Sequence, residues 1–189
     1  PYYHPILPLL VDTSTARRAS PDLPLPAPAF AHPEDAEEQI RRAGEEAAME
    51  VGITDLHPEM IRLLGRLQYR TSYGQNVLKH LVESAHLAAA LAAELGVDPA
   101  IAKRGAFLHD IGKAVTHEIE GSHAIIGAEI ARRLKEPPEV VHCIESHHGE
   151  VEQRTIDAVI AQIADGISGG RPGAPRLVSV RARAAHRPA

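Results

Sequence analysis

The sequence predicts an all-α fold, a helical bundle that lies between a proline-rich N-terminal arm and an irregular C-terminal tail. Apolar residues recur at spacings of three and four over most of the chain, which is the period of an amphipathic helix. No segment shows a convincing period-two alternation of the kind that predicts strands. Aromatic residues make up only 3% of the sequence and tryptophan is absent, so smaller aliphatic side chains must build the core, which favours closely packed helices.

Helix boundaries are predicted from the capping residues, prolines and glycines that flank each apolar stripe. The first helix is expected between Pro33 and Gly52, because proline suits a first turn, acidic residues follow it, and glycine ends it. The longest stripe begins at Gly74 and ends before Gly96. The other helices are expected at residues 58–66, 98–109, 122–134, 137–147 and 155–167.

The two ends of the chain differ in composition from its middle. Prolines recur through residues 1–33, and each one removes a backbone donor and restricts φ, which predicts an arm or linker. Residues 169–189 combine glycine, proline and arginine with few apolar residues, which predicts a frayed tail. The helical domain is therefore placed at residues 34–168.

Charge, cysteine content and hydropathy exclude several classes of protein. The net charge of -5 gives no global reason for tight, sequence-independent binding to nucleic acid. The single cysteine, Cys143, excludes an internal disulfide and is expected to be a small buried residue. No apolar stretch approaches the roughly 18 residues that span a bilayer, which predicts a cytoplasmic location with no membrane segment in this chain. The chain does not begin with Met, so a membrane anchor on a preceding part stays open.

Histidines gather in the helical middle of the sequence together with two aspartates. Imidazole and carboxylate together suit hard or borderline divalent cations. His109 and Asp110 are adjacent, and neighbours on a regular helix diverge by about 100°, so they can converge on one ion only beside the end of their helix. Gly112 is expected to permit that approach. Three further histidines are interpreted as supporting or surface groups: His86, His117 and His142.

The order of these residues resembles the HD superfamily of metal-dependent phosphohydrolases. Its signature is a His, then a His-Asp pair, then an Asp, with additional histidines between them in members that bind two metals. The strings LGRLQYRTSYGQNVLKH, AKRGAFLHDIGKAVTHEIEGSH, EPPEVVHCIESHHGEVE and ADGISGGRPGA are similar to the HD domain of the bacterial ribonuclease Y family, endoribonucleases that start mRNA turnover. They cover about residues 65–174, and the resemblance implies an HD-domain helical bundle.

The resemblance also implies a divalent metal cofactor, expected to be two ions. The implied ligands of the first ion are His80, His109, Asp110 and Asp165. Asp110 is implied to bridge to a second ion, for which His123 and His147 are the further ligands. Mn²⁺ or Mg²⁺ is expected, while Fe, Ni, Co or Zn also suit such a set. Two such ions about 3.5–4 Å apart can activate water and neutralise charge on a phosphodiester.

Three residues are expected to take part in the reaction itself: Asp110, Lys113 and His148. Lys113 is interpreted as a contact to a non-bridging phosphate oxygen, with capping of a helix end as the alternative. His148 is either a further metal ligand or a hydrogen-bonding partner of the substrate. Glu83, one turn after His80, is a candidate for orienting that histidine, whereas Lys103 and Arg104 are expected to form a solvated face.

Three functions follow from these expectations. The first is a metal-dependent endoribonuclease domain that cleaves single-stranded RNA with a metal-activated water. The second is an HD phosphatase or phosphodiesterase acting on nucleotides or cyclic dinucleotides. The third is an inactive HD domain that serves as a scaffold or in dimerisation. Whichever function holds, the resemblance also implies a homodimer, in which the helix at residues 35–51 would pack against its copy in the partner.

Overall fold

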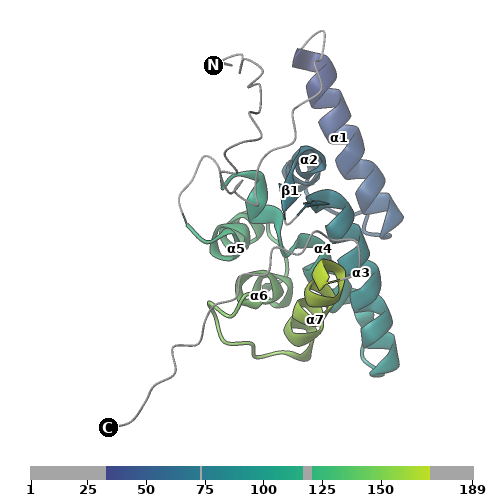
Figure 1. Cartoon of the computed structure of the whole chain (residues 1–189), viewed down its shortest axis with the longest axis vertical. Coiled ribbons are helices and arrows are strands. Elements are labelled where there is room, and N and C mark those ends of the chain that lie inside the picture. Colours follow the sequence, from purple (N-terminus) through teal and green to yellow (C-terminus); the bar gives the residue numbers. More distant parts are fainter. Residues whose placement is uncertain (1–32, 73, 117–120, 171–189) are drawn as a thin grey trace, which may run out of the picture.

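The computed structural model describes residues 33–72, 74–116 and 121–170, and over these residues the fold is all-α as predicted (Figure 1). The helices are α1 (Pro33–Glu50), α2 (Pro58–Arg66), α3 (Val77–Glu94), α4 (Pro99–Leu108), α5 (His123–Arg133), α6 (Pro138–Ser146) and α7 (Ile156–Gly170). Two 3₁₀ turns, η1 (Leu67–Tyr69) and η2 (Ile111–Ala114), and a hairpin of β1 (Thr71–Ser72) and β2 (Gln75–Asn76) lie between them. Most of the predicted arm and the tail beyond Gly170 lie outside the described residues.

Helix α3 is the central element, because it packs against both α4 and α7, which also contact each other (Figure 1). Helix α6 contacts α4, α5 and α7, while α1 lies along α2 at one edge of the bundle. None of the described helices combines the length and apolar character that a membrane crossing requires. The described bundle therefore joins elements from both halves of the sequence around α3.

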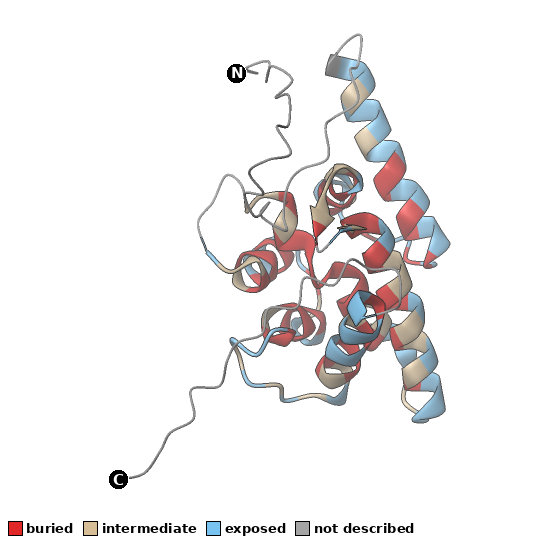
Figure 2. Ribbon diagram, in the orientation of Figure 1, coloured by how far each residue is buried: buried red, intermediate tan, exposed pale blue. Residues whose placement is uncertain are grey.

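The core is built from aliphatic residues, as the low aromatic content predicts. Larger side chains such as Leu81, Phe107 and Ile144 are fully buried in one cluster. A second cluster between α3, α4, α6 and α7 consists mainly of alanines and includes the fully buried Cys143. Figure 2 shows these buried residues on the helix faces that point toward one another. Small side chains let the helices approach closely, which brings donor groups on different helices within reach of one metal site.

The start of α3 differs from the prediction. Residues 71–72 pair antiparallel with residues 75–76, and α3 begins at Val77 rather than at Gly74. Gly74 has a φ of +79°, a left-handed conformation that suits a tight turn and ends any helix that would include it. The side chain of Asn76 then caps α3 by accepting a hydrogen bond from the backbone N–H of Lys79 at 3.1 Å.

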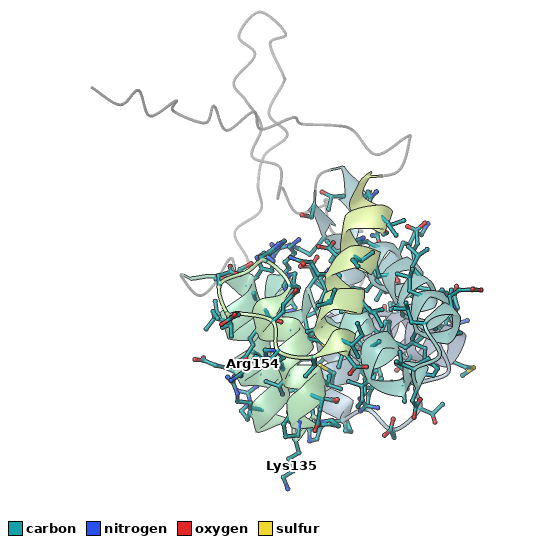
Figure 3. All side chains as sticks on the ribbon, turned by 90° about the horizontal axis from the view of Figure 1, so that it is seen from below. Lys135 and Arg154 are labelled. Atoms are coloured by element: carbon teal, nitrogen blue, oxygen red, sulfur yellow. The ribbon has the colours of Figure 1, made fainter. Side chains whose placement is uncertain are left out.

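The end of α5 corrects the expectation for Arg104. Lys135 adopts a left-handed φ of 64° and points into solvent, as Figure 3 shows. The chain turns there and buries Glu136, whose Oε2 accepts a hydrogen bond from Nε of Arg104 at 2.6 Å. Arg104 also donates to Asp55 at 2.6 Å, and its side chain is only 15% exposed. The predicted solvated face is therefore wrong for Arg104, because a buried carboxylate from a distant segment holds its guanidinium.

Helix α1 uses its apolar face within the chain. Ala43, Ala47 and Ala48 are buried, and α1 packs against α2 along this face. Its other side carries ion pairs such as Arg42 with Glu46 at 2.7 Å. Packing of this helix against a second copy stays a prediction.

Candidate metal centre

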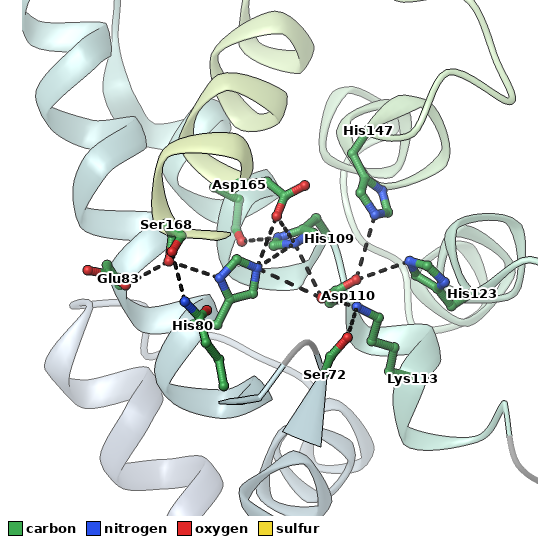
Figure 4. Close-up of polar contacts among 12 residues, drawn as sticks. Ser72, His80, Glu83, His109, Asp110, Lys113, His123, His147, Asp165 and Ser168 are labelled. Carbon is green, nitrogen blue, oxygen red and sulfur yellow. Dashed lines mark hydrogen bonds and ion pairs between the residues drawn. The ribbon is translucent and has the colours of Figure 1, made fainter. Parts of the chain in front are cut away.

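The structure brings all the predicted donor residues together at one place in the bundle (Figure 4). His80 comes from α3, Asp165 from α7, and the others from the α4–η2 junction, the start of α5 and the end of α6. Ligand atoms fall into two groups in which all members lie within 4.8 Å of one another. One group is His80, His109 and Asp110, and the other is Asp110, His123, His147 and His148. Asp110 belongs to both groups, which is the position that a bridging carboxylate would need.

Asp165 completes the first group. Its Oδ1 lies 3.1 Å from Nε2 of His80 and 3.5 Å from Nε2 of His109. Asp110 Oδ2 approaches the same two ring nitrogens at 3.9 and 3.5 Å. Two carboxylates therefore face two imidazole nitrogens, a mixed donor set that suits a divalent cation.

The end of α4 explains how two adjacent side chains converge. The helix ends at Leu108, His109 is its C-cap, and Asp110 has left the helical conformation with φ -97° and ψ 11°. Gly112 is also required by packing, because a Cβ there would lie 2.0 Å from the carbonyl oxygen of His123, while its expected role in admitting a metal stays a prediction. The absence of that Cβ lets η2 touch the first turn of α5, and this contact brings His123 beside Asp110.

His109 and His147 are oriented by the helices that they end. Both are C-cap residues, where the last carbonyl groups of a helix lack intrahelical partners. Nδ1 of His109 lies 2.8 Å from the carbonyl oxygen of Ala106, and Nδ1 of His147 lies 2.7 Å from that of Ile144. A carbonyl only accepts, so each Nδ1 carries a proton and donates it. In the neutral form of each ring, the lone pair of Nε2 then faces the centre.

His80 is also fixed through its Nδ1, but by side chains and not by a backbone carbonyl. Its Nδ1 lies 2.9 Å from Oγ of Ser168, and the Ser168 hydroxyl donates to Oε2 of Glu83 at 2.7 Å (Figure 4). Because Ser168 gives its proton to Glu83, its oxygen accepts from Nδ1 of His80, and Nε2 on the other side of the ring faces Nε2 of His109 at 3.3 Å. Glu83 was a predicted candidate for orienting His80, whereas Ser168 was not predicted, since a lone serine near a helix end carries no signal of such a contact.

Three buried donor atoms support a cation at this centre. Asp110 Oδ1, His123 Nε2 and His147 Nε2 are buried and form no hydrogen bond with any described group. The Asp110 oxygen lies 3.2 Å from the His123 nitrogen and 3.7 Å from the His147 nitrogen, without hydrogen-bond geometry. Buried polar atoms nearly always have partners, so three adjacent exceptions require an explanation. A divalent cation would satisfy all three at once.

The charges of the site are those of a cation-binding centre. Burial alone would lower the pKa of His109, but Asp110 and Asp165 outweigh it and raise that pKa to about 9. Burial opposes ionisation of Asp110 and Asp165, yet neighbouring cationic groups and hydrogen bonds keep the pKa of each carboxyl below its usual range. Burial lowers the pKa of His147, and it lowers that of His148 to about 4 with a further contribution from His147. At physiological pH the centre thus combines ionised carboxylates with a protonated His109 and with neutral His147 and His148, and a cation that binds His109 would displace its Nε2 proton.

A pocket of about 230 Å³ opens onto this centre and contains both groups that were expected to meet substrate. Lys113 Nζ lies 2.8 Å from Asp110 Oδ2 and 3.1 Å from the hydroxyl of Ser72, at the pocket wall. His148 lines the same pocket, and its ring centre lies 4.1 Å from that of His147. The position of His148 fits either of its two predicted roles.

The remaining histidine predictions can be checked only in part. His142 is buried away from the two groups, where Nε2 accepts a hydrogen bond from the backbone N–H of Arg154 at 2.9 Å. It is therefore a buried, hydrogen-bonded residue outside both donor groups, and a supporting role at the metal centre stays a prediction. His86 is exposed on α3, as a surface group would be. His117 lies outside the described residues.

Comparison with known proteins places this centre in a family. The family model for the HD domain matches residues 77–170. A ribonuclease Y from Thermobifida fusca is 68% identical over 142 residues, which cover 75% of this chain and 28% of the relative. Ribonuclease Y from Parafrankia sp. is 71% identical over 135 residues, covering 71% of this chain and 25% of the relative. The corresponding values for Desulforamulus reducens are 60% over 142 residues, 75% and 28%.

The chain spans about a quarter of the length of these relatives. No solved structure gives a significant match. The matches support a metal-dependent hydrolase of the HD type. Residues 77–170 of the chain therefore form an HD domain, and this region is similar to that of ribonuclease Y.

Proposed function

We propose that this chain is the catalytic domain of a metal-dependent endoribonuclease that hydrolyses phosphodiester bonds in single-stranded RNA. The observation that carries the proposal is the position of Asp110 between two groups of donors, with an oxygen that has no hydrogen-bond partner in the described residues. In this proposal Asp110 would be shared by two cations. His80, His109 and Asp165 would hold one with it, and His123 and His147 would hold the other.

The proposed chemistry follows from the residues around the pocket. When bound, divalent cations polarise a phosphoryl oxygen and lower the pKa of water. Lys113 adds a compact positive charge at the pocket wall, where it can meet a non-bridging phosphate oxygen as charge develops in the transition state. His148, which is neutral because burial lowers its pKa, has one N–H to donate and one nitrogen to accept, which suits a hydrogen bond to substrate.

RNA is proposed as the substrate because the relatives with 60–71% identity are named ribonuclease Y. The overall charge of -5 gives little long-range attraction for a polyanion, so the proposal relies on contacts at the pocket itself. The identity of the ions, expected to be Mn²⁺ or Mg²⁺, is part of the same proposal.

The test compares substrates and variants of the purified chain in Mn²⁺ or Mg²⁺. We expect internal cleavage of a labelled single-stranded RNA, and loss of cleavage when EDTA removes the metal. Asp110→Asn should lower the activity by more than the roughly hundredfold that is typical for losing a supporting residue of a metal site. His86→Gln is the matched control, because His86 is exposed on the same helix as His80 and stands outside both donor groups.

The other functions predict different outcomes in the same assay. Turnover of nucleotides or cyclic dinucleotides without RNA cleavage would favour the phosphatase or phosphodiesterase. Metal binding without any turnover would favour the scaffold. Full activity in Asp110→Asn would show that the site assignment is wrong.

A further inference from the structure

Helix α7 ends with three glycines among its last five residues: Gly166, Gly169 and Gly170. None of them has a positive φ, so the backbone conformation does not require glycine at these positions. Packing against the described residues does not require it either, because a Cβ added at any of the three would meet none of their atoms within 4 Å outside the helix's own backbone. Alanine forms helices better than glycine, so these three glycines weaken α7 without a reason in its backbone or packing.

Two of these glycines face the candidate metal centre. Gly166 and Gly169 lie one helical turn apart and line the 230 Å³ pocket together with Asp165, whereas Gly170 is not part of its lining. The same pocket is lined by Asp110, which is 2% exposed and has an Oδ1 atom without a hydrogen-bond partner in the described residues. The missing side chains therefore leave space directly beside donor groups that are aimed at a ligand.

We propose that the bare backbone at Gly166 and Gly169 is the surface over which a polynucleotide strand passes on one side of the scissile phosphate. The inference rests on the proposed function and specifies its substrate class. A strand that is cut internally continues on both sides of the reacting phosphate, whereas a mononucleotide or a small diester does not. Glycine lets such a strand approach the helix backbone closely, and a methyl group on this face would intrude on its path.

The experiment compares the double variant Gly166→Ala/Gly169→Ala with the matched control Gly170→Ala. The control adds a methyl group to the same helix at a position that is equally open but does not line the pocket. For the wild type and each variant we would measure thermal unfolding, Mn²⁺ affinity by titration, and binding of a fluorescent single-stranded RNA by anisotropy. We would also measure hydrolysis kinetics with that RNA and with bis(p-nitrophenyl) phosphate.

The double variant should separate strand binding from the other properties. Each substitution should raise Tm by about 2–4 °C through helix propensity, in the control as well. In the double variant, RNA affinity and kcat/KM for RNA should fall about tenfold, mainly through KM, as intruding methyl groups typically cause. Mn²⁺ affinity and hydrolysis of the small diester should stay at wild-type values, and the control should show the Tm gain alone.

Unchanged RNA affinity in the double variant would overturn the inference, while RNA cleavage by the wild type would leave the proposed function standing. An equal loss on RNA and on the small diester would also overturn it, because the glycines would then serve the reacting centre and not the strand. If the wild type hydrolyses neither substrate, the proposed function fails. The anisotropy measurement still tests whether RNA binds over Gly166 and Gly169, because it compares RNA affinity in the wild type and the double variant.

Discussion

Replacing Ser168 by alanine should weaken divalent metal binding, although Ser168 is not expected to touch the metal. Ser168 is 1% exposed, and its hydroxyl connects Nδ1 of His80, at 2.9 Å, to the carboxylate of Glu83, at 2.7 Å. Without it, the imidazole loses the acceptor that keeps its proton on Nδ1 and its ring in place. His80 would then present Nε2 to the centre only part of the time.

The expected loss of metal affinity in Ser168→Ala can be bounded from the hydrogen bond that the substitution removes. Leaving a buried donor unsatisfied costs about 1–3 kcal/mol. Removing a residue that orients a metal-binding histidine typically lowers metal affinity about 10- to 100-fold. We therefore expect Mn²⁺ affinity to fall about thirtyfold in Ser168→Ala, which corresponds to about 2 kcal/mol. Glu83→Gln should lose less, because an amide oxygen can still accept from the Ser168 hydroxyl.

The assay is isothermal titration of each purified variant with Mn²⁺, with circular dichroism to verify the fold. Ser84→Ala is the matched control, since Ser84 is fully buried on α3 beside Glu83 and its hydroxyl has no hydrogen-bond partner in the described residues. Its removal should leave metal affinity unchanged and should not lower stability. Wild-type affinity in Ser168→Ala, or an equal loss in the control, would refute the assignment of Ser168 as a positioning residue.

Three further predictions concern stability and reactivity. Arg104→Met should lower the free energy of unfolding, measured in urea, by about 3 kcal/mol, because it leaves the buried carboxylate of Glu136 unpaired. Asp55→Asn changes the exposed end of the same network and should cost less than about 1 kcal/mol, so equal losses would contradict this ranking. Burial raises the pKa of Cys143 to about 12, so the thiol should react with DTNB at pH 8 only in unfolded protein, and rapid labelling of the native protein would contradict its burial. Lys135→Gly should stabilise the protein by about 1 kcal/mol by relieving a left-handed φ of 64°, and calorimetry showing a lower Tm would argue against this.

The helices were predictable because their boundaries depend on nearby residues. Asp98 and Ser122 were expected to start helices, and each accepts a backbone hydrogen bond from the residue two positions on. The hairpin at residues 71–76 was missed because strands of two residues are too short to show alternation. The burial of Arg104 was missed because its partner Glu136 lies 32 residues further along the chain.

The donor residues of the candidate site were predictable from the sequence, but the residues that orient them were not. The order of His80, the His109-Asp110 pair and Asp165 gave a resemblance that named the donors in advance. Their convergence in space is observed, whereas metal ligation by them stays a prediction. Ser168 lies 88 residues from His80, and no local pattern connects the two.

The sequence by itself determined where the helices start and stop and which side chains carry nitrogen and oxygen donors, because capping, periodicity and donor chemistry are properties of single residues and short stretches. Only the tertiary structure decided that Asp110 lies between two groups of imidazoles, that Ser168 holds His80, and that the glycine face of α7 borders the pocket. The physical reason is that these relations arise when α3, α4, α6 and α7 bury a common core, and burial joins residues that are far apart along the chain.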